Sequence, residues 1–199
     1  WLGPWTPEHR VPRGVEYWDL ELETSAEGSE SSRLRVFRST RRAARGALYV
    51  MPGVHHQGPD DPRMVRFCSV LADAGILVGA PFIPDLVELR LTEQAVEDTI
   101  CSMEAFLGLD EMPGSIQPGV FCISTASILG IHAAADPRLM ERLGGMVLFG
   151  GFADWERSLR FMLTGQLPNG DAVEADPLNR TVVFLNMLPW LDGIPDDPA

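Results

Sequence analysis

The sequence is poor in positive charge and has no long apolar run, and each shortage excludes a class of protein. Its 199 residues carry 16 basic and 28 acidic side chains, which gives a net charge of −12 at pH 7. An acidic surface repels nucleic-acid phosphates and anionic lipid headgroups, so we expect neither a nucleic acid nor a membrane as a partner. No stretch approaches the roughly 18 continuous apolar residues that a membrane span requires.

Cysteine is also scarce. Cys68, Cys101 and Cys122 lie inside apolar runs and are not spaced as metal ligands. Such cysteines are typical of small buried side chains in a reducing compartment, so we expect a cytoplasmic protein without a metal site or a cofactor. No signal peptide is evident, and the first residue is Trp1 rather than Met. We therefore expect a trimmed or partial sequence.

Strand and helix signals alternate from residue 47 onward. Short apolar runs predict buried strands at 47–51, 76–79, 120–123 and 145–149, and helical patterns predict helices at 63–74, 92–107 and 126–135. Parallel strands need such crossovers, so the order predicts an α/β fold with a mostly parallel sheet and helices on both faces. Residues 80–91, which contain Pro81 and Pro84, are expected to form a loop.

Both ends of the chain depart from this alternation. Residues 1–14 predict an irregular arm, and alternating residues at 15–22 and 33–37 predict an N-terminal antiparallel hairpin around a turn at 23–32. A group of arginines at 38–45 predicts a solvated loop. Its members are Arg38, Arg41, Arg42 and Arg45, with Arg35 just before them on the strand. Near the other end, 153–163 predicts a helix. Residues 181–188 could form a strand, but the helix-start pair Asp176-Pro177 favours a helix that ends near 192–193.

The strongest functional signal lies in residues 118–135. A buried strand ends at Ser124, and a helix of small and apolar residues follows. A serine at a strand–turn–helix junction is the context of a nucleophile elbow. The frame is Cys122-Ile123-Ser124-Thr125-Ala126, where the usual frame has glycine at both outer positions. Cysteine and alanine are compact enough for the turn, and the alternative role of Ser124 is to cap the helix.

Hydrolysis by a serine needs a nucleophile, a histidine base, an acid that orients the base and two N–H donors for the oxyanion. In a parallel sheet these parts collect at the carboxyl ends of the strands, where Ser124 is predicted to lie. The backbone N–H of Thr125 would be one oxyanion donor, at the start of a helix. The second would be the N–H of Val54, in the loop after the first central strand.

A base and an acid are harder to assign. His9 lies in the leading arm, and His132 lies about two helical turns beyond the serine. His55 and His56 follow the first central strand and are expected to line the pocket. Adjacent histidines can bind a metal, but no partner stands at ligand spacing. Asp154 follows the next strand and is a candidate acid or a helix N-cap.

With these motifs the chain resembles the α/β-hydrolase superfamily, nearest to its dienelactone-hydrolase-like or esterase-like branch. The resemblance runs from about residue 15 to 163 and is carried by 48–53, 60–63, 71–75 and 121–127. It implies a serine esterase with an oxyanion hole, acting on a small ester-like molecule. It also implies a helical cap that includes 176–191. The chain would then be a single domain, 1–199, with core sheet and helices at 15–151 and a cap segment at 152–199.

The resemblance further implies that the acid and histidine follow two more strands, and none is evident before Ala199. The expectation is a C-terminally incomplete fragment of a longer hydrolase or a chain that has lost catalysis. Three functions stay open on these residues. The first is a serine hydrolase, the second is a non-catalytic member that binds a ligand or a protein partner, and the third is a transferase of the same fold.

Overall fold

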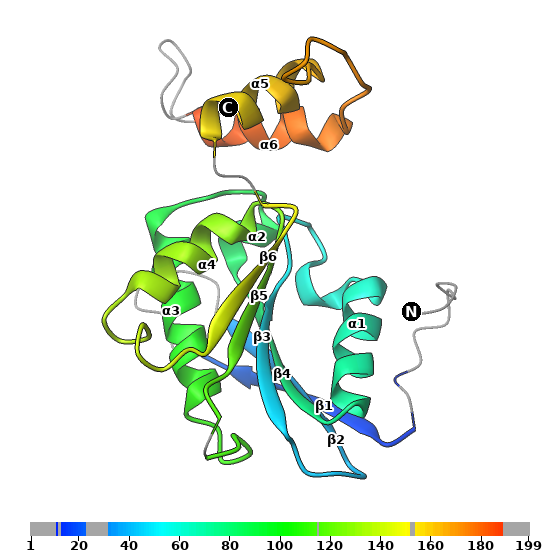
Figure 1. The fold of residues 1–199 in the computed structure, drawn as a ribbon, viewed down its shortest axis with the longest axis vertical. Coiled ribbons are helices and arrows are strands. Elements are labelled where there is room, and N and C mark those ends of the chain that lie inside the picture. The colour runs from blue at the N-terminus through cyan, green and yellow to red at the C-terminus, as the bar shows by residue number, and fades with distance from the viewer. Residues whose placement is uncertain (1–10, 12, 23–31, 115, 152–153, 189–199) are drawn as a thin grey trace, which may run out of the picture.

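The computed structural model describes residues 11, 13–22, 32–114, 116–151 and 154–188. Within these ranges one sheet is covered by helices on both faces, and two further helices lie beyond one end of the sheet (Figure 1). The predicted arm at 1–14, with His9, and the turn at 23–32 lie almost wholly outside the described residues. The expected helix end at 192–193 lies outside them as well.

The sheet has six strands in the order β1-β2-β4-β3-β5-β6. Their bounds are β1 (Val15–Glu21), β2 (Arg33–Ser39), β3 (Gly46–Met51), β4 (Ile76–Phe82), β5 (Gly119–Ile123) and β6 (Gly145–Phe149). β2 is antiparallel to both β1 and β4, and the other neighbours are parallel. The predicted α/β class and the N-terminal antiparallel hairpin are therefore confirmed.

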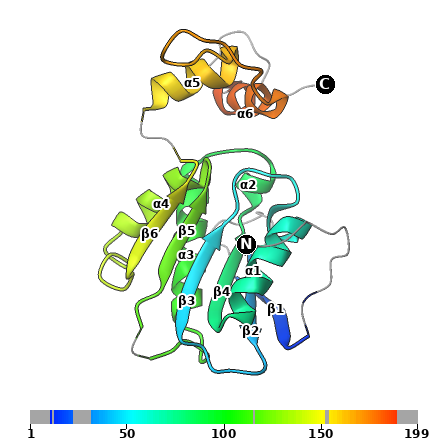
Figure 2. The same ribbon diagram turned by 45° about the vertical axis from the view of Figure 1, so that its right-hand side comes forward.

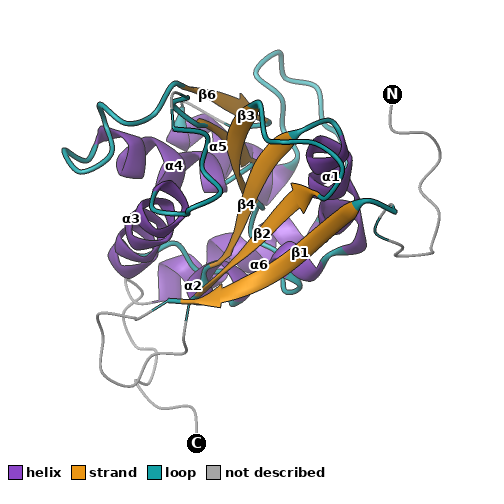
Figure 3. Cartoon of the chain, turned by 90° about the horizontal axis from the view of Figure 1, so that it is seen from below, coloured by secondary structure: helices purple, strands orange, loops and turns teal. Residues whose placement is uncertain are grey.

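Helices form a layer on each side of this sheet (Figure 3). α1 (Pro62–Asp73) covers one face, and α3 (Glu93–Leu107) and α4 (Ala126–Ala135) cover the other. The first residues of α1 and α3 are held by side-chain caps. The Asp61 carboxylate accepts the Arg63 N–H at 2.8 Å, and the Thr92 hydroxyl accepts the Ala95 N–H at 3.0 Å.

The central strands are apolar on both sides because both faces of the sheet are buried. In β3, Tyr49 and Met51 pack with the α3 and α4 layer, and Val50 packs with α1. All three side chains are fully buried. A strand covered on both faces shows a continuous apolar run rather than an alternating one, which is why these segments could be recognised from sequence.

The loop predicted at 80–91 is wrong over much of its length. β4 continues to Phe82, and its last residues pair with β2, where Pro81 lies opposite Leu34. Pro84 then begins a short helix, α2 (Pro84–Val87). A proline fits the first position of a helix because that N–H has no intrahelical acceptor. Prolines here mark a strand end and a helix start, and the remainder of 80–91 is loop.

The last described elements are α5 (Trp155–Thr164) and α6 (Pro177–Met187), which pack against each other beyond the carboxyl ends of the parallel strands (Figure 2). They confirm the helices predicted at 153–163 and 176–191 over the described residues. α5 ends at Gly165, whose φ of +71° closes the helix with a hydrogen bond to Phe161 O. Across the described ranges no helix has the length and apolarity needed to cross a bilayer.

Candidate functional site

The site lies where the chain changes direction across the sheet. β3 pairs with β4 on one side and β5 on the other, and the two connecting layers cover opposite faces. In open α/β sheets the crevice at such a switch point, outside the carboxyl ends of the strands, is where ligands bind. The loops after β3 and β5 meet closely here. A Cβ atom added to Gly53 would lie 3.2 Å from Ile123 O and 3.4 Å from Ser124 Cβ.

Ser124 occupies this crevice in a strained backbone conformation. Its φ is +54°, and Leu89 is the only other non-glycine residue with a positive φ in the described ranges. The Ser124 N–H donates to Phe149 O at 2.8 Å, so the ladder with β6 continues one residue past β5 before the chain turns. A left-handed conformation costs a non-glycine residue about 1–2 kcal/mol. The turn therefore leaves Ser124 exposed at the end of β5 and stores strain in it.

Ser124 does not cap the helix that follows. The N-cap of α4 is Thr125, and no side chain makes a capping hydrogen bond there. The capping alternative predicted for Ser124 is therefore not what the structure has.

A glycine on the helix accommodates the cysteine that replaces an elbow glycine. A Cβ atom added to Gly130 of α4 would lie only 2.3 Å from Cys122 Sγ, so the thiol fills the space that Gly130 leaves. Cys122 and Ala126 are both fully buried. Burial raises the pKa of the Cys122 thiol to about 12, which keeps it uncharged at neutral pH. β5 and α4 therefore pack closely although neither residue 122 nor residue 126 is a glycine.

The two predicted oxyanion donors face the same space as Ser124. Val54, Ser124 and Thr125 together line a cavity of about 690 Å³. Within the described part of the chain, the backbone N–H groups of Val54 and Thr125 donate no hydrogen bond to the protein. Thr125 also stands at the start of α4, where the helix dipole favours negative charge.

The far wall of this cavity, which we call the Ser124 cavity, is formed by α5 and α6, and we refer to these two elements as the cap helices because they lie over the crevice. Asp154 and Asp176 both line it, and each is a helix N-cap. Asp154 accepts from the Arg157 N–H at 3.0 Å, and Asp176 accepts from the Leu178 N–H at 2.9 Å. The sequence predicted both as helix starts, with Asp154 also a candidate acid, but gave no signal that Asp176 or Arg157 would face the crevice.

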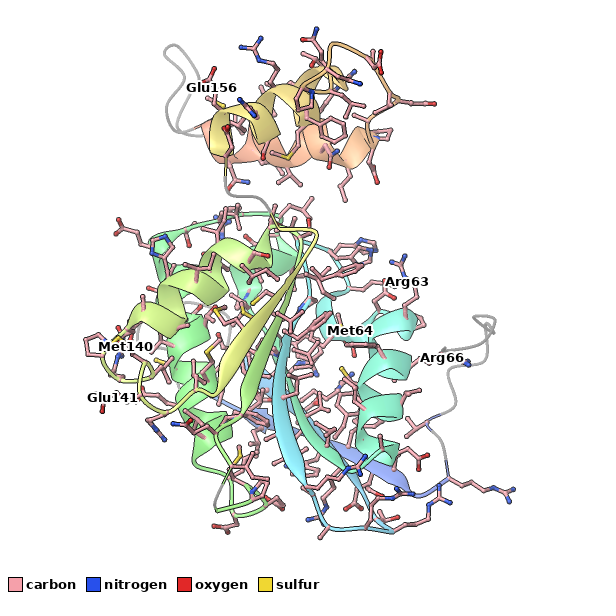
Figure 4. All side chains as sticks on the ribbon, in the orientation of Figure 1. Arg63, Met64, Arg66, Met140, Glu141 and Glu156 are labelled. Atoms are coloured by element: carbon pink, nitrogen blue, oxygen red, sulfur yellow. The ribbon has the colours of Figure 1, made fainter. Side chains whose placement is uncertain are left out.

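A second cavity, of about 760 Å³, opens on the α1 side of Ser124. His55 lines it, with Asp61 and the phenylalanines of neighbouring elements. In Figure 4, Met64 lies between α1 and the sheet, and Arg63 lies on the outer side of the helix. His56 is exposed and stacks on His55, with ring centroids 4.5 Å apart. Of the two predicted pocket histidines, His55 therefore lies on the wall and His56 outside it.

His55 is held by its own loop. Its Nδ1 accepts the Gln57 N–H at 3.3 Å, and its Nε2 lies 3.7 Å from Asp61 Oδ2. The hydrogen bond from Arg63 lowers the pKa of Asp61 to about 2 against the opposing effect of burial. Nδ1 of His55 thus accepts a hydrogen bond within the loop, and Nε2 faces the Asp61 carboxylate. The remaining described histidine, His132, is exposed in the last turn of α4.

Ion pairs of Arg35 connect the end of this loop, at Asp60, to the N-terminal hairpin. The Arg35 guanidinium donates to both carboxylate oxygens of Asp19, at 2.7 and 2.9 Å, and to Asp60 Oδ1 at 2.6 Å. Arg35 lies on β2, where the strand was predicted, and is only 7% exposed. Its charge is buried because two carboxylates pair with it. Among the described residues no three His, Cys, Asp or Glu side chains are grouped as a metal site.

Comparison with solved structures identifies proteins that share the fold of this chain. The esterase Est22 superposes with a TM-score of 0.59 at 12% identity, over 84% of this chain and 49% of that one. Brefeldin A esterase, a bacterial homologue of human hormone-sensitive lipase, gives 0.56 at 20% identity, over 79% and 47%. Dienelactone hydrolase from Anabaena variabilis gives 0.52 at 16% identity, over 80% and 71%. The chain has an α/β-hydrolase fold.

The predicted resemblance is confirmed at the level of this α/β-hydrolase fold. No protein-family model matches the sequence, and a search of curated proteins finds no match. The chain spans about half the length of the two esterases named above. In the α/β-hydrolase fold of this chain, Ser124 and the Val54 loop stand at the carboxyl ends of β5 and β3, facing the cap helices.

Proposed function

We propose that this chain carries the nucleophile and the oxyanion hole of an ester hydrolase that acts on a small ester-like substrate. Ser124 would be the nucleophile, and the backbone N–H groups of Thr125 and Val54 would bind the oxyanion. The observation that carries the proposal is the φ of +54° at an exposed serine, at the switch point of the sheet. A strained strand-to-helix turn that exposes the serine is the geometry of a nucleophile elbow.

In the proposed reaction the Ser124 Oγ forms a bond to the ester carbonyl carbon, and its proton passes to a general base. The carbonyl oxygen becomes an oxyanion, which the two N–H groups stabilise without reorganisation because the loops already hold them. Collapse of this intermediate breaks the bond to the alcohol, and water then releases the acyl group from the serine. No described histidine shares a hydrogen bond with Ser124. We propose that the base and its acid come from outside the described residues.

The second candidate function is ligand or protein binding without catalysis. It is favoured by the described histidines, none of which hydrogen-bonds Ser124; His55 accepts from the Gln57 N–H and faces Asp61 instead. Against it stands the strain at Ser124. Backbone strain of about 1–3 kcal/mol persists mainly where a functional geometry depends on it. A transferase of the same fold would use the same serine and differ in the acceptor of the acyl group.

A covalent probe tests the nucleophile directly. The full-length protein, which under this proposal supplies the base and the acid, would be treated with a fluorophosphonate and analysed by intact mass and peptide mapping. We expect one adduct on Ser124, which Ser124→Ala abolishes. Ser127→Ala is the matched control, because Ser127 is buried three residues after Ser124 and its replacement should leave labelling unchanged. Absence of an adduct, or equal labelling of Ser124→Ala, would overturn the assignment.

Turnover separates the two candidate functions. Release of p-nitrophenol from p-nitrophenyl acetate, lost in Ser124→Ala, is the result expected of the hydrolase. Saturable binding of the same ester without release of p-nitrophenol or labelling would favour the binding protein.

A further inference from the structure

Ser124 lies on the wall of two cavities, and Asp176 lies on the wall of both as well. One is the Ser124 cavity, of about 690 Å³, and the other is the cavity of about 760 Å³ beside α1, which we call the α1-side cavity. Asp176 stands directly before the first residue of α6. An ester whose carbonyl carbon is at Ser124 therefore shares a cavity with this carboxylate, whichever of the two cavities it occupies.

The other charged side chains of the two cavities are paired with each other. In the Ser124 cavity, Arg157 Nε lies 3.1 Å from Asp154 Oδ2. In the α1-side cavity, Arg63 Nη2 lies 2.6 Å from Asp61 Oδ2, and His55 faces the same carboxylate. Each arginine on these described walls therefore has a carboxylate of its own, and none is left free for a ligand anion.

The Asp176 carboxylate has no such partner. Its Oδ1 atom accepts the Leu178 N–H at 2.9 Å, and within the described ranges the carboxylate forms no ion pair. The N-terminus of α6 carries a partial positive charge of about half a unit, which leaves this end of the helix net negative. The hydrogen bond to Leu178 fixes the position of the side chain, and Oδ2 stays free to accept from a ligand.

Both cavities also contain phenylalanine side chains. Phe161 of α5 lines the Ser124 cavity, and Phe121 and Phe149 line the α1-side cavity, where their ring centroids are 6.2 Å apart. The faces of aromatic rings attract quaternary ammonium groups. In either cavity an alkylated ammonium therefore has both a carboxylate and aromatic rings to contact.

We infer that the ester substrate carries an alkylated ammonium group and that Asp176 binds this cation. The inference rests on the proposed function of Ser124. An ester with a carboxylate group would be disfavoured, because Asp176 repels it and the arginines of both walls are already paired. Asp176 is exposed, and exposed ion pairs change affinity by up to about fivefold. We therefore expect a preference of about fivefold for a cationic over a neutral ligand, and of about fivefold for a neutral over an anionic one.

Three methyl ketones test this cation site without any requirement for catalysis. They share a three-methylene spacer and differ in charge: 5-trimethylammonio-2-pentanone is cationic, 6,6-dimethyl-2-heptanone is neutral and 5-oxohexanoate is anionic. In the full-length protein labelled with [methyl-13C]methionine, Met162 reports binding in the Ser124 cavity and Met64 in the α1-side cavity. We expect the affinities to fall in that order, with smaller differences in about 1 M NaCl. Equal affinities would overturn the inference, and so would tightest binding of 5-oxohexanoate, since Arg157 would then exchange Asp154 for the ligand.

A matched pair of variants locates the charge that is responsible. Asp176→Asn removes the charge and keeps the helix cap, because asparagine caps a helix as well as aspartate does. Glu174→Gln removes the same charge two residues earlier, at an exposed position that lines neither cavity. We expect Asp176→Asn to abolish the preference for the ammonium ketone and Glu174→Gln to keep it. Equal losses in the two variants would assign the preference to the net charge of −12 rather than to Asp176 and would refute the site.

Turnover of esters with the same three end groups separates this inference from the function on which it rests. The p-nitrophenyl esters would be those of 4-trimethylammoniobutanoate, 5,5-dimethylhexanoate and glutarate. We expect kcat/KM to be highest for the ammonium ester and the preference to be lost in Asp176→Asn. Equal turnover of all three esters, with equal affinities for the ketones, would refute the cation site while the hydrolase stands. A charge preference among the ketones without turnover or labelling of Ser124 would refute the hydrolase while the cation site stands.

Discussion

Replacement of Gly130 by alanine tests whether the cysteine in the serine turn is accommodated by the helix behind it. The new Cβ atom would lie 2.3 Å from Cys122 Sγ, 3.3 Å from Met146 Cε and 3.4 Å from Met51 Sδ. Ordinary contacts between such atoms are about 3.5–4.0 Å. Cys122 has little room to retreat, because it is fully buried and its Sγ already lies 3.7 Å from Met51 Sδ.

Two opposing effects set the size of the change. Alanine favours the helix over glycine by about 1 kcal/mol. Overpacking a close-packed core costs about 1–3 kcal/mol, and the 2.3 Å approach to Cys122 Sγ places this site near the upper end. We therefore expect Gly130→Ala to lower the free energy of unfolding by about 1–2 kcal/mol. In a Cys122→Ala background the obstructing sulfur is gone, and the same change should be neutral or stabilising.

Urea unfolding followed by circular dichroism measures both effects in a double-mutant cycle. The expected coupling energy between positions 122 and 130 is about 1–3 kcal/mol, with m-values unchanged across the four proteins. If Gly130→Ala stabilises the wild type as much as it stabilises Cys122→Ala, the two positions are independent and the compensation is refuted.

Three further predictions concern the backbone, the acid response and the cap. Ser124→Gly should be more stable than Ser124→Ala by about 1 kcal/mol in urea, because glycine adopts a positive φ without strain; equal stability would contradict the strain. Arg63 lowers the pKa of Asp61 from 3.8 to about 2, so this carboxylate adds stability above about pH 4 that is lost as the pH falls toward 2. Asp61→Asn, which keeps the helix cap, should lose that part of the acid dependence in pH titrations of unfolding. Asn186→Ala removes the side-chain oxygen that accepts the Leu91 N–H at 2.7 Å, so it should speed hydrogen exchange of the Leu91 amide about tenfold and leave exchange in β5 unchanged.

The fold could be predicted from sequence where the signal is local. Apolar runs such as 120–123 mark strands covered on both faces, and cap residues such as Thr92 mark helix starts, because these patterns depend on near neighbours only. The end of β4 could not be predicted this way. Pro81 argues against a strand locally, but the strand continues because β2, far away in sequence, pairs with it. The ion pairs of Arg35 could not be predicted for the same reason, since its partners Asp19 and Asp60 come from separate elements.

In the candidate site too, only the features that depend on local sequence could be predicted. The placement of Ser124, Thr125 and Val54 around one crevice follows from strand order, which local signals predict. The hydrogen bond from the Leu91 N–H to the Asn186 side chain could not be predicted in this way. The two residues are 95 positions apart, and an asparagine within a helix gives no sign of its partner. The cavity walls formed by α5 and α6 could not be predicted for the same reason. The sequence could therefore place the candidate nucleophile and oxyanion donors, but not the cavity that surrounds them.

The features around Ser124 are best explained together. A strained, exposed serine and two backbone N–H groups that donate to no described acceptor lie at one crevice. The strain alone would be open to correction by a common substitution such as Ser124→Gly. An ester whose carbonyl oxygen accepts from both N–H groups would place its carbonyl carbon beside the exposed serine. The strain at Ser124 is then the cost of a preorganised turn that lets an ester react without rearrangement of the protein.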